Sequence, residues 1–425
     1  MNELTVRKIA ILGGNPETGA LVQIANSMGL HTVVLDPDPK SPAKKYACTS
    51  FDIDVFDLDA IDEKIREVKI EGVLVGVADP LVYFYQKICE RNNFFCYANE
   101  KSIGALTSKK RFSEACRSHG ITVTPFFEID IRSKTQIASL DYPVVVKPVD
   151  SGAGAGISVC QKPGAFQFAV EKALKASPRK EIIIEKLMQC DDIFAYYTFV
   201  DGIAYISAIA DRYKTAKQGN LSAVCIAAEY PSQHTDRFLQ DVHPKLIHLF
   251  QNLGIQNGVL CIQFFVDKSN FYAYDPGFRL QGEAPHLYLK YINHFDHREM
   301  LLRFAMTGQM LTSDFRKLND IKFKGMFATT IWVPLKAGTI KSVRGLDQIR
   351  ARPDVIEVFQ RLYPGETVSS DMLGTERQVF ARIYTIANTR DASLNTINYI
   401  HRTLTVEDQS GEDMILDRYY KVAND

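Results

Sequence analysis

The chain has 425 residues, of which 46% are hydrophobic, and its fifty basic and fifty acidic side chains cancel. This length exceeds one compact core of usual size, so two or three domains are expected. The zero net charge argues against a general nucleic-acid binder, and the sequence has no apolar run long enough to predict a membrane span. Eight scattered Cys without a Cys-x-x-Cys pair predict reduced thiols, a cytoplasmic protein and no zinc site.

The N-terminal part alternates short apolar strands with helices. Strands are predicted at residues 8–12, 32–35 and 73–77, and a helix at 20–28. This alternation predicts a parallel α/β sheet with its ligand at the carboxyl ends of the strands. The turn that contains Gly13, Gly14 and Gly19 lacks the GxGxxG spacing, although Asp36 stands where a ribose-binding acid would. We interpret the turn as a Rossmann-like backbone feature that leaves small-substrate binding open.

The rest of the chain is richer in strands. A helix is predicted to begin near Lys109, with Thr107 or Ser108 as its cap. Further strands are predicted at 144–147, 157–160, 181–185, 193–200, 259–266, 271–275 and 327–333, with Asp191 and Asp192 in a turn. Helices are predicted at 353–362 and 395–403.

A lysine followed by a glycine-rich loop is the first candidate site. Lys147 ends a strand, from where its ammonium can point at a phosphate. The loop after it contains Ser151, Gly152, Gly154 and Gly156. Such a loop lets backbone N–H groups approach phosphate oxygens closely. It is not a Walker motif, because no Gly-Lys-Ser or Gly-Lys-Thr follows the glycines. A flexible hairpin turn explains the glycines equally well if this feature is taken alone.

A strand that runs into an extended hinge is the second candidate site. The strand ends at Glu185, and Lys186, Leu187 and Met188 follow. The hinge backbone can pair with an adenine edge, and the side chains of Leu187 and Met188 can sandwich the ring. Asp192 can hold ribose hydroxyls. A buried strand with solvated turn acids explains these residues if they are considered alone.

Gln263 and Asp275, on two successive strands, are the candidate metal ligands. Oxygen ligands on adjacent strands suit Mg²⁺, which binds carboxylates together with phosphate oxygens. Arg279, four residues after Asp275, can stabilise charge on a phosphoryl group during its transfer. A strand-end polar group and a surface arginine are the plainer interpretation of each residue by itself.

In this order and spacing the three groups resemble the ATP-grasp superfamily, over roughly residues 8–310. The resemblance implies an α/β fold with ATP between a lid and a larger α/β part. It adds Lys109 as a second phosphate-binding lysine, which precedes Lys147 in the chain. It also matches Lys147, the glycine-rich loop after it and Glu185 to the ATP site of the family. It places the hinge backbone at 186–188 and the ribose acid at Asp192.

The resemblance also implies the domain organisation. Residues 1–105 are expected to form a Rossmann-like pre-ATP-grasp domain, 106–185 the lid-bearing region, 186–310 the metal and substrate region, and 311–425 a C-terminal α+β extension. Such an extension is similar to that of carboxylate–amine ligases and biotin-carboxylase-like members.

Several positions depart from the family pattern. Gln263 stands where a first metal carboxylate is common, Gly277 replaces an Asn, and Cys190 replaces the Gly two residues before the ribose acid. One well-held Mg²⁺, or Mn²⁺, and a weaker second ion are therefore expected. The run from Arg279 to Glu283 resembles the Arg-x-Gln-x-Glu run of biotin carboxylase, where the Glu is a base.

The resemblance implies an ATP- and Mg²⁺-dependent ligase of the carboxylate–amine type. A substrate carboxylate attacks the γ-phosphate, and an amine, or less favourably a thiol or hydroxyl, then attacks the acyl phosphate, with release of ADP and phosphate. Arg279 and Glu283 are the catalytic candidates. The expected partners are a small-molecule acid and amine, with no nucleic acid and no membrane, and a homodimer is left open.

Three other functions stay open. A biotin-carboxylase-like or carbamoyl-phosphate-like enzyme would use bicarbonate, and bicarbonate-dependent ATP turnover would support it. A nucleotide-binding protein with little ligase activity is suggested by Gln263 and Gly277, and would bind ATP tightly without acid-dependent ADP release. A dehydrogenase that uses the N-terminal turn is least favoured, and NAD binding tests it.

Overall fold

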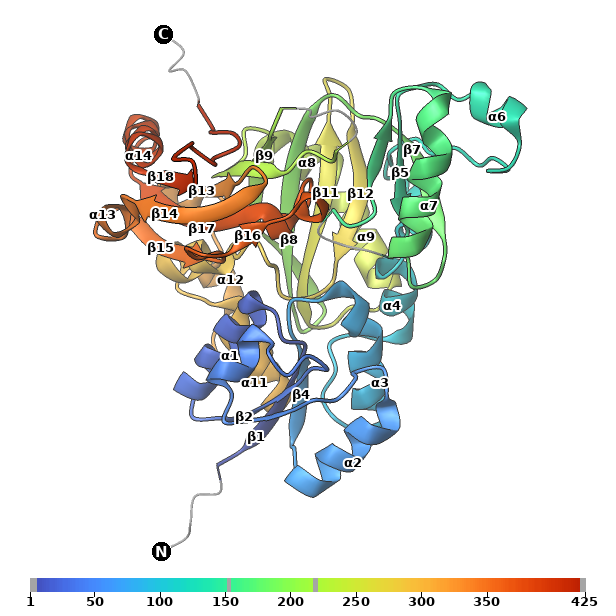
Figure 1. The fold of residues 1–425 in the computed structure, drawn as a ribbon. Coiled ribbons are helices and arrows are strands. Elements are labelled where there is room, and N and C mark those ends of the chain that lie inside the picture. Colours follow the sequence, from blue (N-terminus) through green and yellow to red (C-terminus); the bar gives the residue numbers. More distant parts are fainter. Residues whose placement is uncertain (1–5, 151–153, 217–220, 421–425) are drawn as a thin grey trace, which may run out of the picture.

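The computed structural model describes residues 6–150, 154–216 and 221–420. Its N-terminal domain is a parallel sheet in the order β3-β2-β1-β4 (Figure 1). Its strands are β1 (Lys8–Leu12), β2 (His31–Leu35), β3 (Thr49–Phe51) and β4 (Gly72–Val75). Helix α1 (Pro16–Ser27) connects β1 to β2, α2 (Leu58–Val68) connects β3 to β4, and α3 (Val82–Asn92) follows β4. The predicted parallel α/β sheet is confirmed.

Helix α1 begins before the predicted residue 20. Asn15 caps it by accepting the N–H of Thr18 at 2.8 Å, and Pro16 takes the first helical position. The glycine turn that precedes α1 is filled by its own chain, because a Cβ on Gly14 would lie 2.0 Å from Ser41 Oγ. Gly14 thus has a packing reason to lack a side chain.

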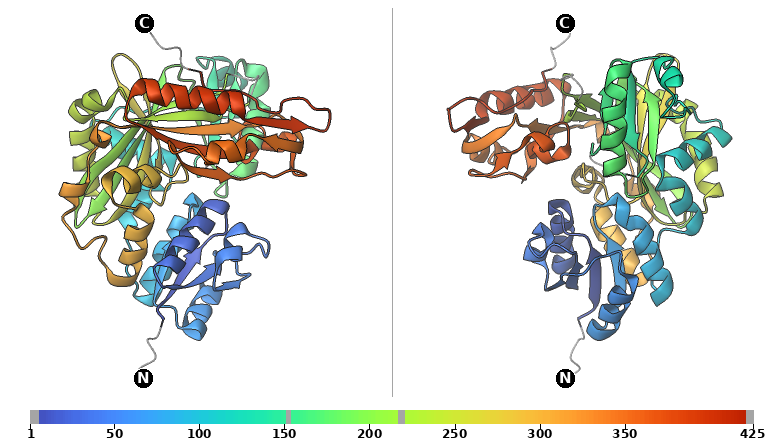
Figure 2. Two further views of the ribbon diagram at one scale, coloured as in Figure 1. Left: turned by 90° about the vertical axis from the view of Figure 1, so that its left-hand side faces the viewer. Right: turned by 45° about the vertical axis from the view of Figure 1, so that its right-hand side comes forward.

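A helix from much later in the sequence packs on this domain. Helix α11 (His297–Thr307) lies against β4 and α1 (Figures 1 and 2). The approach is close, because a Cβ on Gly72 would lie 2.5 Å from the carbonyl oxygen of Ala305. Gly72 thus has a packing reason to lack a side chain, and α11 holds the N-terminal sheet to the centre of the molecule.

A small antiparallel sheet forms the lid, in the order β6-β5-β7. Its strands are β5 (Val144–Pro148), β6 (Ser158–Cys160) and β7 (Ile182–Lys186), and the chain reaches them through α4 (Glu100–Leu106), α5 (Lys109–Ser118) and α6 (Lys134–Ala138). Helix α7 (Phe166–Ala176) buries Phe166 and Val170 against the sheet. Ser108 precedes α5 as predicted, but its side chain makes no capping hydrogen bond.

The largest sheet is antiparallel, in the order β12-β11-β8-β9-β10-β13-β17-β15. Its strands are β8 (Asp191–Val200), β9 (Ile203–Lys214), β10 (Cys225–Tyr230), β11 (Gly258–Val266), β12 (Phe271–Gly277), β13 (Phe327–Pro334), β15 (Val355–Gln360) and β17 (Val379–Ala387). Helices α8 (Thr235–Asp241) and α9 (His243–Asn252) lie between β10 and β11 in the chain. This central sheet runs through both the 186–310 and the 311–425 ranges.

The remaining α-helices and strands lie between and after the strands of the central sheet along the chain. They are α10 (His286–Tyr288), α12 (Phe315–Leu318), α13 (Leu346–Arg350) and α14 (Arg390–Thr403), with a small sheet of β14 (Gly338–Arg344), β16 (Thr367–Val368) and β18 (Thr405–Asp408). The helix predicted at 395–403 is confirmed as α14.

Two predicted elements are wrong. The segment 353–362 contains the strand β15 and not a helix: Val355 and Val358 are buried, and β15 pairs along β17, with Val355 opposite Thr385. Pairing with a neighbouring strand decides the conformation of such β-branched runs. Asp191 and Asp192 open strand β8 and do not form the turn before it.

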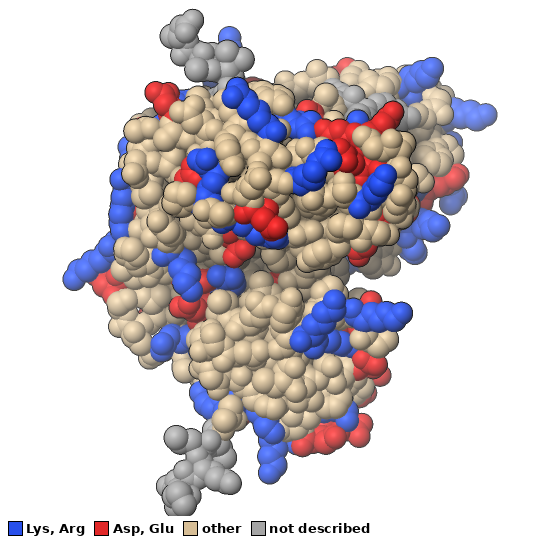
Figure 3. All heavy atoms as spheres, turned by 60° about the vertical axis from the view of Figure 1, so that its left-hand side comes forward, with Lys and Arg blue, Asp and Glu red and all other residues tan. Residues whose placement is uncertain are grey.

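The face shown in Figure 3 carries small groups of acidic and of basic side chains that lie near one another. None of the helices in the described parts of the chain combines the length and apolar character needed to cross a bilayer.

Candidate active site

A cavity of about 1150 Å³ lies where the lid sheet, the central sheet and the N-terminal domain meet. Twelve of the fifteen predicted site residues line it: Lys109, Lys147, Gly154, Glu185, Lys186, Leu187, Met188, Asp192, Gln263, Asp275, Arg279 and Glu283. Ser151 and Gly152 lie outside the described residues. Gly156 was predicted in the phosphate loop but is not on the cavity wall, and a Cβ there would lie 2.6 Å from the Cβ of Ala176.

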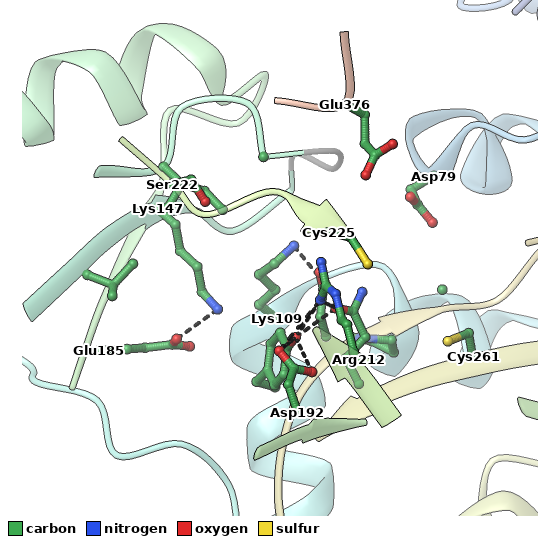
Figure 4. A pocket seen from close by; sticks show the side chains of 18 of the residues that line it. Asp79, Lys109, Lys147, Glu185, Asp192, Arg212, Ser222, Cys225, Cys261 and Glu376 are labelled. Atoms are coloured by element: carbon green, nitrogen blue, oxygen red, sulfur yellow. Dashed lines mark hydrogen bonds and ion pairs between the residues drawn. The ribbon is translucent and has the colours of Figure 1, made fainter. Parts of the chain in front are cut away.

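Lys147 and Glu185 form a buried ion pair on the lid sheet. Lys147 on β5 lies opposite Ile183 on β7, so Glu185 is its diagonal neighbour on the same face. Lys147 Nζ is 2.7 Å from Glu185 Oε2, and the two side chains are only 7% and 6% exposed. Figure 4 shows them facing each other. The pair therefore holds the lysine ammonium in place at the cavity.

Two further ion pairs bring cations to the same cavity. Lys109 opens α5, and its Nζ is 2.9 Å from Asp275 Oδ1 on β12. Burial opposes the charge of Lys109, but the Asp275 carboxylate outweighs it and raises the pKa of the lysine. Arg279 Nη2 is 2.5 Å from Oδ2 of Asp79, which follows β4. Three cations thus converge on the cavity, from β5, from α5 and from the loop after β12.

Gln263 and Asp192 belong to a hydrogen-bonded cluster on the central sheet. The carboxamide oxygen of Gln263 accepts from Arg212 Nη1 at 2.7 Å and from the hydroxyl of Tyr274 at 2.8 Å. Two bonds match the two lone pairs of that oxygen. Asp192 is 4% exposed, pairs with Lys214 and lies 3.7 Å from Arg212. A metal role for Gln263 and a ribose role for Asp192 therefore stay predictions that need these contacts to rearrange.

The cations on β9 were missed by the sequence analysis. Arg212 and Lys214 are two residues apart on β9, so they project from the same face of the sheet. Burial lowers the pKa of Lys214, although Asp192 opposes this. Burial also opposes the charge of Arg212, but Tyr274 and Asp192 raise its pKa. In the sequence, the only sign of these cations is the Arg-x-Lys spacing. That spacing indicates a site only when the structure shows that β9 lines the cavity.

The hinge backbone is partly occupied by its own chain. The N–H of Lys186 donates to the carbonyl of Pro125 at 2.9 Å, and the N–H of Leu187 donates to Pro143 at 3.2 Å. The ammonium of Lys186 pairs with Asp141 at 2.8 Å. These two N–H groups are therefore already bonded within the chain. An adenine edge would have to pair with the carbonyl groups of the hinge or with the backbone of Met188.

Loops from three distant parts of the chain meet at the cavity, and we call Gly154, Ser222 and Gly374 the roof. A Cβ on Gly154 would lie 2.8 Å from the carbonyl oxygen of Gly374, and a Cβ on Gly374 would lie 3.1 Å from the nitrogen of Ser222. The N–H of Gly374 donates to Gln378 Oε1 at 2.5 Å, which fixes this loop. The C-terminal extension thus contributes to the site, which the sequence analysis did not predict.

A buried arginine, Arg382, connects the N-terminal domain, the segment around Glu283 and the C-terminal extension. Arg382 Nη1 donates to the carbonyl of Gly282 at 2.5 Å and to Glu17 Oε1 at 3.0 Å, and its Nη2 donates to Glu376 Oε2 at 3.1 Å. Glu17 belongs to α1, and Arg382 to β17. This contact holds the segment around Glu283 between the N-terminal domain and the C-terminal extension.

Known proteins match the chain in sequence only partly. Residues 116–273 match the family model described as D-ala D-ala ligase C-terminus. The chain is 25% identical over 198 residues to the formate-dependent phosphoribosylglycinamide formyltransferase of Prochlorococcus marinus. That match covers 45% of this chain and 50% of the relative, so the chain spans about half the length of that protein.

Solved structures match nearly the whole chain. The L-amino acid ligase of Bacillus licheniformis superposes with a TM-score of 0.77 at 18% identity, over 95% of this chain and 99% of that one. The biotin carboxylase domain of the Hydrogenobacter thermophilus 2-oxoglutarate carboxylase, in complex with MgADP, ADP and bicarbonate, gives 0.73 at 16% identity, over 94% and 90%.

The chain therefore has an ATP-grasp fold, as the order of motifs predicted. In its fold the chain resembles an L-amino acid ligase and a biotin carboxylase domain, in agreement with the resemblance to carboxylate–amine ligases and biotin-carboxylase-like members.

Proposed function

We propose that the chain is an ATP-dependent ligase that activates a small carboxylic acid as an acyl phosphate and joins it to an amine, with release of ADP and phosphate. The observation that carries this proposal is the convergence of Lys109, Lys147 and Arg279 on one cavity beside the carboxylate of Asp275. Three cations at one place suit a triphosphate and an acid that must approach each other.

The cations have to exchange partners when ATP binds. Lys147 turns from Glu185, and Lys109 from Asp275, to phosphate oxygens, while Arg279 stabilises the charge on the phosphoryl group in transfer. Carboxylate and triphosphate repel each other, and the three cations offset that repulsion. The roof excludes water, which would otherwise hydrolyse the acyl phosphate.

The donor set fits one Mg²⁺ or Mn²⁺ held jointly with the nucleotide. Among the described residues, no group of three or more His, Cys, Asp or Glu is placed to hold a metal ion. Mg²⁺ commonly binds through one or two carboxylates and substrate phosphates, and the side chain of Asp275 is 27% exposed at the cavity. When bound, the metal supplies positive charge at the phosphates. Gln263 becomes a ligand only if it gives up Arg212 or Tyr274.

The acceptor step needs a group that takes a proton from the amine. Glu283 lines the cavity beside Arg279 and is our candidate for this base. The same placement would suit a bicarbonate-using enzyme, which the likeness to a biotin carboxylase domain with bound bicarbonate favours as second candidate. Small-molecule substrates, a cytoplasmic location and a homodimer stay predictions.

The proposal is tested by ADP release from ATP and Mg²⁺ in bicarbonate-free buffer, with panels of acids and amines. We expect release that requires an acid and that produces one amide per ADP when the amine is present. Turnover that requires bicarbonate and needs no amine would favour the second candidate. Tight ATP binding without release in any mixture would favour a nucleotide-binding protein.

A further inference from the structure

The N-terminal domain gives the cavity an apolar wall. Six residues of the described range 6–105 line the cavity: Phe56, Asp79, Pro80, Val82, Tyr83 and Phe84. Asp79 is the one charged group among them, and it already pairs with Arg279 at 2.5 Å. Within this described range no Lys or Arg lines the cavity. The wall therefore offers no cation to a phosphate or to a second carboxylate.

Three of these residues form a cluster of rings, Phe56, Tyr83 and Phe84, which we call the aromatic wall. The ring centroids of Phe56 and Phe84 are 4.6 Å apart, and those of Tyr83 and Phe84 are 5.2 Å apart with an edge-to-face arrangement. Phe56 remains 54% exposed and Tyr83 41% exposed. Large rings left exposed in the wall of a cavity provide a surface for an apolar ligand.

The aromatic wall lies beside the groups that act on the acid. Tyr83 and Phe84 stand in the first turn of α3, just after Asp79, whose carboxylate contacts Arg279. If the carboxylate group of the substrate acid reaches the phosphates near Arg279, the rest of the acid therefore lies next to the start of α3. The name of the Prochlorococcus relative indicates a phosphoribosyl substrate, whose phosphate would need a cation that this wall lacks.

We infer that the acid activated by this chain carries an apolar, preferentially aromatic group that packs on the aromatic wall, and that Phe56 and Phe84 determine this specificity. The inference rests on the proposed function and adds the class of substrate to it. It predicts that sugar phosphates and dicarboxylic acids are poorer substrates than aromatic acids.

Trapping of the acyl phosphate tests the acid without knowledge of the natural amine. Hydroxylamine attacks the acyl carbon, forms a hydroxamate and releases phosphate, so hydroxamate counts activated acid. The acids are 3-phenylpropionate and L-phenylalanine against glutarate, L-glutamate and 3-phosphoglycerate. We expect kcat/KM at least about tenfold higher for the aromatic pair, a factor within the range that apolar pockets achieve.

Variants then locate the selectivity. Phe56→Ala and Phe84→Ala should each raise KM for the aromatic acids about tenfold, with KM for ATP unchanged, and Phe84→Leu should restore part of the loss. Phe168→Ala is the matched control, because Phe168 is 71% exposed on α7 and is not on the cavity wall. Phe56 is exposed enough that its loss should leave the fold intact.

The outcomes separate this inference from the proposed function. Equal use of the polar acids, or unchanged KM in both alanine variants, would overturn the inference and leave the ligase proposal standing. So would an aromatic requirement that falls on the acceptor amine and not on the acid. Hydroxamate from none of these five acids, while another acid of the panel supports ADP release, would also overturn the inference alone. Only a lack of acid-dependent ADP release across the whole panel would contradict the proposed function.

Discussion

At the scale of residues, every cation proposed to contact phosphate is already paired with a carboxylate. Lys147 pairs with Glu185, Lys109 with Asp275, and Arg279 with Asp79. A buried charge without a partner is strongly unfavourable, so these pairs hold the cations in place before ATP arrives. Phosphate oxygens can replace the carboxylates because they offer charge-assisted hydrogen bonds of the same kind.

Lys147→Met tests this arrangement. The variant removes one charge-assisted contact, worth roughly 1.5–3 kcal/mol, so the Kd for ATP should rise at least about tenfold. Titration with a fluorescent ATP analogue measures it. Lys175→Met is the matched control, since Lys175 is an exposed lysine of the same lid that is not on the cavity wall. An unchanged affinity in folded Lys147→Met would remove Lys147 from the phosphate site.

The metal ligands are distinguished by two other variants. Asp275→Asn should raise the Mg²⁺ concentration for half-maximal ADP release by about tenfold, because it removes the carboxylate that the metal shares with phosphate. Gln263→Ala should raise it much less, because the oxygen of Gln263 is held by Arg212 and Tyr274. The reverse order of the two shifts would make Gln263 the principal ligand.

At the scale of elements, the sequence predicts local motifs and misses long-range ones. The lysine strand, the glycine loop and the hinge each lie within a few residues, so their spacing could be read directly, and the pair Gln263 and Asp275 lies on adjacent strands. Arg212 and Lys214 can be recognised as site residues only from the structure, in which β9 pairs with β8 at the cavity. The strand β15 was missed because the helix prediction overlooked the strand propensity of Val355, Ile356 and Val358, which the pairing with β17 reinforces.

The roof is the feature that the sequence could not show, because its loops are far apart in the chain. Gly374→Ala adds a Cβ that would lie 3.1 Å from Ser222 N and forces a strained φ, which is +74° in the structure. Turnover should fall on the order of 10- to 100-fold from the misplaced loop, and the ratio of ADP to hydroxamate should rise as water enters.

Gly365→Ala is the control for backbone strain. Its φ is +93°, but its Cβ would meet nothing within 4 Å, so it carries the strain of a positive φ without the contact. Equal losses of turnover in the two variants, with no change in the ratio of ADP to hydroxamate, would contradict a role for Gly374 in closing the site.

At the scale of the whole molecule, the three parts are joined through buried polar groups as well as apolar packing. Arg382 connects β17 to Glu17 of the N-terminal domain and to Gly282 beside the site. Helix α11 carries the buried His297 and packs on the N-terminal sheet. The charge states of such groups therefore affect the stability of the whole chain and not only of the domain that contains them.

Acid should destabilise the fold through His297. Its Nε2 is 2.8 Å from Thr198 Oγ1, and burial lowers its pKa from 6.5 to about 4, although Asp296 opposes this. The unfolded chain takes up the proton near pH 6.5 and the folded chain only near 4, so stability falls as pH drops through that window. The full effect is about 3 kcal/mol.

The urea midpoint, measured at several values between pH 7 and pH 4, checks this prediction. His297→Asn should be less stable than the parent at pH 7 but should lose less stability on acidification, because the residue that titrates is gone. The same pH dependence in both proteins would show that His297 does not account for the acid sensitivity.

The central claim is that a carboxylate oxygen becomes bonded to the γ-phosphorus. Transfer of oxygen-18 tests this most directly: an acid that supports ADP release is labelled in both carboxylate oxygens and incubated with ATP, Mg²⁺ and an amine. The amine displaces phosphate from the acyl carbon, so one labelled oxygen should leave in each phosphate released, and mass spectrometry should find one oxygen-18 per phosphate. Phosphate that carries no label while amide accumulates would contradict the acyl phosphate.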